Sequence, residues 1–120
     1  KIKHLKQVLK TELSEFNGIL YVSKKLDLDT SGIKDLCFDL GSEFNNLFLL
    51  FGAENNGKAT LTCYISKEIV AQNHMNAGQV VRELGRHIQG GGGGQPFFAT
   101  AGGKNPDGIQ KALDLAKSYI

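Results

Sequence analysis

Cysteine and long apolar runs are scarce in this 120-residue sequence, and each scarcity argues against a class of protein. Its two cysteines, Cys37 and Cys63, stand far apart and outside any CxxC pattern. Such spacing favours buried thiols in a reducing compartment over a disulfide-stabilised scaffold. No apolar run approaches the ~18 residues of a membrane span, and no signal peptide is recognisable. We therefore expect a cytoplasmic protein without a membrane partner.

Residue patterns typical of catalytic centres are also missing. His4, His74 and His87 show no metal-ligand spacing such as HxxxH, and no CxxC accompanies them. No serine stands in a G-x-S-x-G nucleophile elbow. Asp27 and Asp29 precede an expected helix, where helix capping explains them better than acid–base chemistry. The sequence thus predicts no catalytic residue, no metal site and no cofactor in this chain.

Charge is nearly balanced overall but is distributed unevenly along the chain. The formal net charge is +2. Residues 24–54 contain three lysines against six acidic residues, a net of −3, whereas residues 58–120 contain seven cationic residues against four acids, a net of +3. The start of the chain is basic as well, with Lys1, Lys3, Lys6 and Lys10. An anionic partner is therefore expected at the C-terminal half or at the first helix.

Apolar periodicity and turn residues predict alternating helices and strands. Helices are expected at 1–13, at 30–40 after the N-cap candidates Thr30 and Ser31, from 77 after Asn76, and after Asn105-Pro106. Strands are expected at 18–26, 46–54, 58–66 and, as a short piece, 96–101. The turn residues at 54–57 predict that the second and third of these strands form a hairpin.

This alternation predicts one compact α/β domain with a mixed β-sheet of about four strands packed by helices. Residues 1–13 are rich in lysine and do not begin with Met. We expect them to be the end of a preceding helical segment, and residues 14–120 to be the globular domain, so that the chain is a piece of a longer protein.

Five consecutive glycines, Gly90 to Gly94, pose the main question of the sequence, and a second pair follows at 102–103. In a loop, such residues let backbone N–H groups converge on an anion without obstruction by Cβ atoms, which is the geometry of a phosphate nest. The run is no Walker loop, because Lys104 is followed by Asn105. A purely structural turn is the alternative.

The stretch GGGGGQPFFATAGG resembles the G-x-G-G-G-R-P-x-x-A-x-A-G-G signature of the C-terminal domain of alanyl-tRNA synthetase. GQVVRELGRHIQ before it and the final helix opened by Asn-Pro stand where that family has its flanking helices. A related domain accompanies the DHH phosphoesterases, where the cluster is commonly Gly-Gly-Gly-His. Here Gln95 and Pro96 follow the glycines, which favours the synthetase branch, although Gln95 replaces the usual Arg.

The resemblance implies a tRNA-binding domain of an alanine–tRNA ligase that grips the outer corner of an alanine-accepting tRNA. It implies that aminoacylation and editing, with their ATP and zinc, belong to other domains of the same chain. The alternative is the substrate-recognition domain of a DHH-type phosphoesterase acting on oligonucleotides. Whether the domain dimerises stays open.

The candidate RNA-binding residues cluster around the glycine run, which the helix from residue 77 enters directly. They are Arg82, Arg86, Gly92, Gly93, Gly94, Gln95 and Lys104. For the arginines the alternative is a solvated helix face. For Phe97 and Phe98 we expect one core side chain and one partly covered side chain, and base stacking is the alternative.

Overall fold

One mixed sheet of six strands organises the chain, in the order β1-β2-β3-β4-β6-β5. The structure, a computed structural model, describes residues 2–120 without the side chains of Ile2 and Lys3. The charges predicted at Lys1 and Lys3 therefore lie outside the described part. The strands are β1 (Ser14–Phe16), β2 (Ile19–Lys25), β3 (Leu47–Asn55), β4 (Lys58–Ile65), β5 (Gly90–Gln95) and β6 (Phe98–Gly103).

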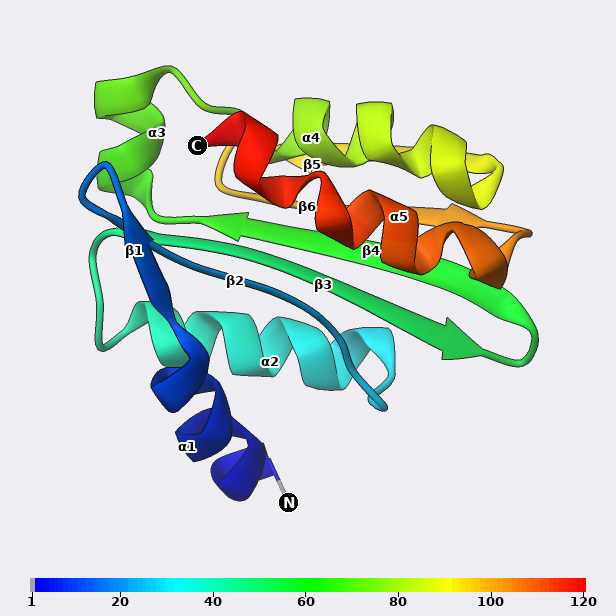
Figure 1. The fold of residues 1–120 in the computed structure, drawn as a ribbon, viewed down its shortest axis with the longest axis horizontal. Coiled ribbons are helices and arrows are strands. Elements are labelled where there is room, and N and C mark those ends of the chain that lie inside the picture. Colours follow the sequence, from blue (N-terminus) through cyan, green and yellow to red (C-terminus); the bar gives the residue numbers. More distant parts are fainter. Residues whose placement is uncertain (1) are drawn as a thin grey trace.

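Helices cover both faces of this sheet. The α-helices are α1 (Ile2–Glu12), α2 (Thr30–Gly41), α3 (Lys67–Asn73), α4 (Ala77–Leu84) and α5 (Ile109–Asp114). Short 3-10 turns are η1 (Gly85–Ile88), η2 (Pro106–Gly108) and η3 (Ala116–Tyr119). Figure 1 shows α4 and α5 together on one face, and α2 with α1 beyond it on the other. No described helix has the length and apolarity that crossing a bilayer demands.

Strand β3 is the central strand because both of its faces are buried. Phe48 and Leu50 pack toward α4 and α5, whereas Leu49 and Phe51 pack toward α2. The β2–β3 pair is parallel, and every other strand pair is antiparallel. The parallel pair follows from α2, which connects β2 to β3 as a crossover helix.

The predicted α/β class and mixed sheet are confirmed, but the sheet has six strands rather than about four. One unpredicted strand is β1, which pairs with β2 across a turn at Asn17 and Gly18. Both turn residues have positive φ, as a type I′ hairpin turn requires. The other is β5, formed by the glycine run itself. The N-cap of α2 is Asp29, which accepts from Gly32 N at 2.8 Å, so neither Thr30 nor Ser31 has that role.

The two thiols are buried and unpaired, as the sequence predicts. Burial raises the pKa of both Cys37 and Cys63, so both remain neutral thiols at physiological pH.

Helix α1 packs on α2 through one buried side chain and a group of ion pairs. Leu9 is fully buried among the residues beneath α2. Lys6 Nζ lies 3.0 Å from Asp39 Oδ1 and also pairs with Glu43, and Lys10 Nζ lies 2.7 Å from Glu43 Oε1. The basic start of the chain is thus partly neutralised by the acids of α2 and of the residues that follow it.

Glu43 makes this contact pH-dependent. Hydrogen bonds from Lys10 and Lys6 lower the pKa of Glu43 from 4.5 to about 2. A carboxyl whose pKa is lowered by folding stabilises the fold above its unfolded pKa, and that stabilisation is lost as pH falls through the folded pKa. We expect Glu43→Gln to lower the melting temperature slightly at pH 7, with the difference from the parent shrinking below pH 4.5 and vanishing near pH 2.

Thermal melts followed by circular dichroism between pH 2 and 7 check this, with Glu15→Gln on the exposed strand β1 as control. A difference between parent and Glu43→Gln that persisted unchanged at pH 2 would contradict the assignment.

Candidate nucleic-acid interface

The glycine run forms an edge strand of the sheet, and the predicted loop is wrong at this point. Strand β5 pairs with β6 alone, in a register that sets Gly90 opposite Gly103 and Gln95 opposite Phe98. Two residues, Pro96 and Phe97, connect the strands. Glycine is disfavoured in strands, so the element forms because pairing with β6 and packing under α4 outweigh that preference.

Alternate glycines of β5 differ in what surrounds them. A Cβ at Gly90, Gly92 or Gly94 would lie 1.8, 2.1 or 2.7 Å from a carbonyl oxygen of β6. At Gly91 nothing lies within 4 Å of that position, and at Gly93 the nearest atom is Arg82 Nη2 at 3.8 Å. Close approach to β6 is therefore what excludes side chains at 90, 92 and 94.

The same geometry decides where the backbone groups of β5 point. In an antiparallel pair, hydrogen-bonded and non-hydrogen-bonded residue pairs alternate, and Cα atoms approach most closely in the non-hydrogen-bonded pairs. The close approaches assign 90, 92 and 94 to the non-hydrogen-bonded pairs. Their N–H and C=O groups are thus directed away from β6, toward an edge of the sheet that α4 approaches at Gly90 and Gly94. They form an extended row rather than the converging nest that the sequence predicts.

Two glycines of the preceding segment bring α4 close to this strand. A Cβ at Gly78 would lie 3.2 Å from Gly94 O, and one at Gly85 would lie 3.4 Å from Gly90 O. The start of α4 is fixed to the β5–β6 turn by a 2.8 Å hydrogen bond from Ala77 N to Pro96 O. Asn76 caps the helix as predicted, accepting from Gln79 N. This role of Gly78 and Gly85 is not among the predictions from the sequence, although their seven-residue spacing along a helical segment is a signal of close packing.

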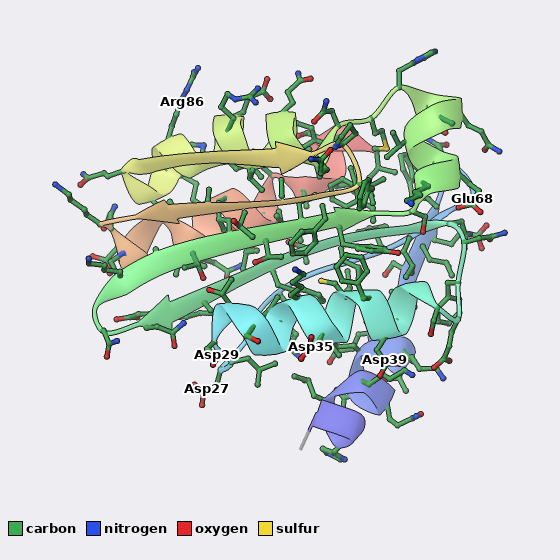
Figure 2. All side chains as sticks on the ribbon, turned by 180° about the vertical axis from the view of Figure 1, so that it is seen from behind. Asp27, Asp29, Asp35, Asp39, Glu68 and Arg86 are labelled. Atoms are coloured by element: carbon green, nitrogen blue, oxygen red, sulfur yellow. The ribbon has the colours of Figure 1, made fainter. Side chains whose placement is uncertain are left out.

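Arg82 and Arg86 are exposed, and Arg82 lies over Gly93 of β5. Within residues 2–120 neither forms an ion pair, and the nearest acid in sequence, Glu83, accepts instead from Tyr119 Oη at 2.7 Å and from Gln79 Nε2 at 3.1 Å. These hydrogen bonds, led by the one from Tyr119, lower the pKa of Glu83. Figure 2 shows Arg86 projecting from the molecule at the side opposite Asp27, Asp29, Asp35 and Asp39. Arg86 therefore lies away from these four acids.

The remaining predicted residues lie at the two ends of β5. Gln95 is exposed at the C-terminal end, and Lys104 is exposed just beyond Gly103, which pairs with Gly90 at the other end. A six-residue strand spans about 17 Å, so Gln95 and Lys104 do not share one contact point. The structure brings together Arg82 and Gly93, flanked by Gly92 and Gly94.

Neither Phe97 nor Phe98 is a core residue, so the expected division into one core and one partly covered side chain is wrong. Both are partly buried. The Phe97 ring lies 4.9 Å from Lys67 Nζ. Phe98 lies 5.3 Å from the Phe38 ring on the α2 face of the sheet. The buried residues of β6 are instead Ala99 and Ala101, whose small side chains leave room for α4.

Within the described residues, no group of three or more His, Cys, Asp or Glu side chains could hold a metal ion.

The profile of the DHHA1 domain family matches residues 17–120. The chain belongs to this family. It is 64% identical over 120 residues to the alanine–tRNA ligase of Christiangramia forsetii and 45% identical over 120 residues to that of Flavobacterium psychrophilum. Each match covers 100% of this chain and 14% of the relative, so the chain spans about one seventh of the length of those enzymes.

A solved relative of this DHHA1 domain has the same fold. The C-Ala domain of Aquifex aeolicus alanyl-tRNA synthetase superposes with a TM-score of 0.75 at 26% identity, over 89% of this chain and 96% of that one. The resemblance drawn from the glycine signature is thereby confirmed. A DHH-domain protein described as a member of the s1p family of ribosomal proteins, with a TM-score of 0.58 at 11% identity, shares the fold.

Proposed function

We propose that this DHHA1 domain is the tRNA-binding domain of an alanine–tRNA ligase, and that it holds the outer corner of alanine-accepting tRNA. In this proposal, other domains of the same cytoplasmic chain carry out aminoacylation and editing and hold the ATP and zinc. The alanine–tRNA ligase relatives and the C-Ala neighbour support it. The phosphoesterase alternative has the shared fold in its favour and no further observation.

One arrangement carries the proposal: two arginines without ion pairs in the described chain lie near an edge strand whose first five residues have no side chains. Arg82 extends over Gly93, and the neighbouring backbone groups of Gly92 are directed away from β6, whereas Gly90 O and Gly94 O approach Gly85 and Gly78. A phosphodiester backbone can approach such an edge closely, because no Cβ atoms keep it away. The arginines supply the charge that phosphate binding requires, and the backbone N–H groups supply donors.

This arrangement predicts weak, sequence-tolerant and salt-dependent binding. Arg82→Ala combined with Arg86→Ala should weaken tRNA binding about tenfold at ~0.1 M salt. If each arginine neutralises one phosphate, the slope of log K against log salt should fall by about 1.4 to 1.8. Titration of fluorescent tRNA at four or more salt concentrations measures both quantities.

The matched control removes two positive charges elsewhere. Lys24 and Lys25 lie on β2 and pair with Glu12 and Glu54, so their double alanine variant has the same change in net charge. It should bind tRNA within about twofold of the parent, because exposed ion pairs contribute little and β2 lies away from β5. Equal losses in both double variants would assign the binding to net charge alone and contradict the proposed interface.

A further inference from the structure

Several aromatic side chains lie close together next to the C-terminal end of β5, beside the candidate interface. A cavity of about 370 Å³ opens between the end of α2, the start of α3 and the β5–β6 turn. Its aromatic lining consists of Phe38, Phe44, Tyr64 and Phe97. This volume falls within the range of about 300 to 1,000 Å³ that small-molecule sites occupy.

The rings of this aromatic cavity are held in place by one another. Phe38 meets Tyr64 edge to face at 5.4 Å between centroids and meets Phe98 at 5.3 Å. Phe38 is nevertheless 41% exposed, so part of its ring is open to solvent. A ring fixed on one side and open on the other can stack with an incoming planar group without further ordering.

Polar groups at the rim suit a ligand with hydrogen-bonding edges. Asn45, Ser42 and Glu68 line the cavity beside Lys67, whose Nζ lies 4.9 Å from the Phe97 ring. Partial burial raises the pKa of Tyr64, so its hydroxyl keeps its proton and can donate. Figure 2 shows Glu68 and Asp39 at this side of the molecule.

The acids near the cavity are largely offset by lysines. Asp39 and Glu43 pair with Lys6 and Lys10, and Glu68 stands next to Lys67. Such a rim does not favour a highly charged ligand inside the cavity. Such a rim is compatible with an uncharged planar ring inside the cavity. A phosphate attached to that ring would then lie outside the cavity, near Lys67 or near Lys34, which lies above the Phe98 ring.

We propose that the aromatic cavity receives one unstacked nucleobase of the RNA whose backbone crosses β5. This inference rests on the proposed function. The chain runs from Gln95, at the end of the candidate interface, through Pro96 to Phe97 in the cavity wall, so the two sites are continuous. The base stacks against Phe38, and the polar rim contacts its edge, as in recognition of single-stranded RNA segments.

Titration of tRNA with three phenylalanine variants tests whether a nucleobase stacks on Phe38. Phe38→Ala should weaken binding about tenfold while leaving the salt slope unchanged, because it removes a stacking surface and no phosphate contact. Phe38→Tyr keeps the ring and should bind within about twofold of the parent. Phe16→Ala is the matched control: Phe16 is 39% exposed and also lies near a lysine, Lys117 at 4.9 Å, but on the edge strand β1.

Photocrosslinking of the parent protein to tRNA, followed by mass mapping, provides a readout that no folding defect can imitate. Adducts on Phe38, Phe44 or Tyr64 support the inference. Adducts confined to residues 82–95 would overturn the inference, and so would a Phe38→Ala variant that binds tRNA like the parent. In either case the proposed function still stands if the Arg82→Ala, Arg86→Ala double variant binds tRNA less tightly. A Phe38→Ala variant that binds tRNA normally but no longer associates with the other domains of the ligase assigns the cavity to a protein segment instead. A parent that does not bind tRNA at all overturns both proposals.

Discussion

Gly92→Ala is expected to lower the free energy of unfolding by about 3 kcal/mol, whereas Gly93→Ala should leave it within about 0.5 kcal/mol of the parent. The new Cβ at 92 would lie 2.1 Å from Thr100 O and 2.5 Å from Ala101 Cα. Both are backbone atoms of a paired strand, so relief requires β5 to move away from β6. The Cβ at 93 would meet only the flexible end of Arg82, at 3.8 Å.

Thermal melts of the two variants measure this contrast, and a loss of 3 kcal/mol corresponds to a decrease of roughly 10 °C for a domain of this size. The two substitutions are chemically identical and adjacent, so each is the other's control for the general effect of replacing glycine by alanine. Equal melting temperatures for both variants would mean that β5 does not pair with β6 in the described register.

Leu9→Ala is expected to destabilise the chain by about 3 kcal/mol, as for other fully buried leucines. Leu9 is the one fully buried residue of α1 among those described, and it packs under α2. An 11-residue helix is marginal by itself in water, so α1 depends on this contact. Amide hydrogen exchange should show loss of protection in α1 before the rest of the domain.

Gln7→Ala is the control for this second prediction, because Gln7 is exposed on the same helix and alanine is a good helix former. It should melt at or slightly above the parent temperature. If Leu9→Ala behaved in the same way, residues 1–13 would be a separate segment that rests on the globular domain without stabilising it.

Local residue patterns are sufficient to predict most of the helices and strands, but they do not predict the glycine-rich strand β5. The Asn56-Gly57 turn and the apolar run at 47–53 determine the β3–β4 hairpin, and the same Asn-Gly signal at 17–18 was available for β1. The strand β5 has no such signal. Pairing with β6, which contains the small residues 99 and 101, and the close approach of α4 override glycine's low strand propensity, and neither contact has a signal in the glycine run itself.

Part of the candidate site could be predicted from the sequence, and part of it could not. Arg82 and Arg86 could be found because a helix leads directly into the glycines, and the structure places Arg82 over Gly93. The aromatic cavity could not be found, because Phe38, Tyr64 and Phe97 come from α2, β4 and a turn. No spacing in the sequence relates these three residues, and only the folding of α2 and α3 against the sheet brings them together.

A strand whose first five residues are all glycine carries very little information about its own alignment. In other strands a shift by one residue turns every side chain to the opposite face, and that mismatch prevents slippage. Moving β5 by one position would exchange one glycine for another at four of its first five positions, and would bring Gln89 or Gln95 into the remaining one. Its alignment must therefore be imposed from its two ends: by Ile88, fully buried just before it, and by the hydrogen bond between Ala77 N and Pro96 O just after it.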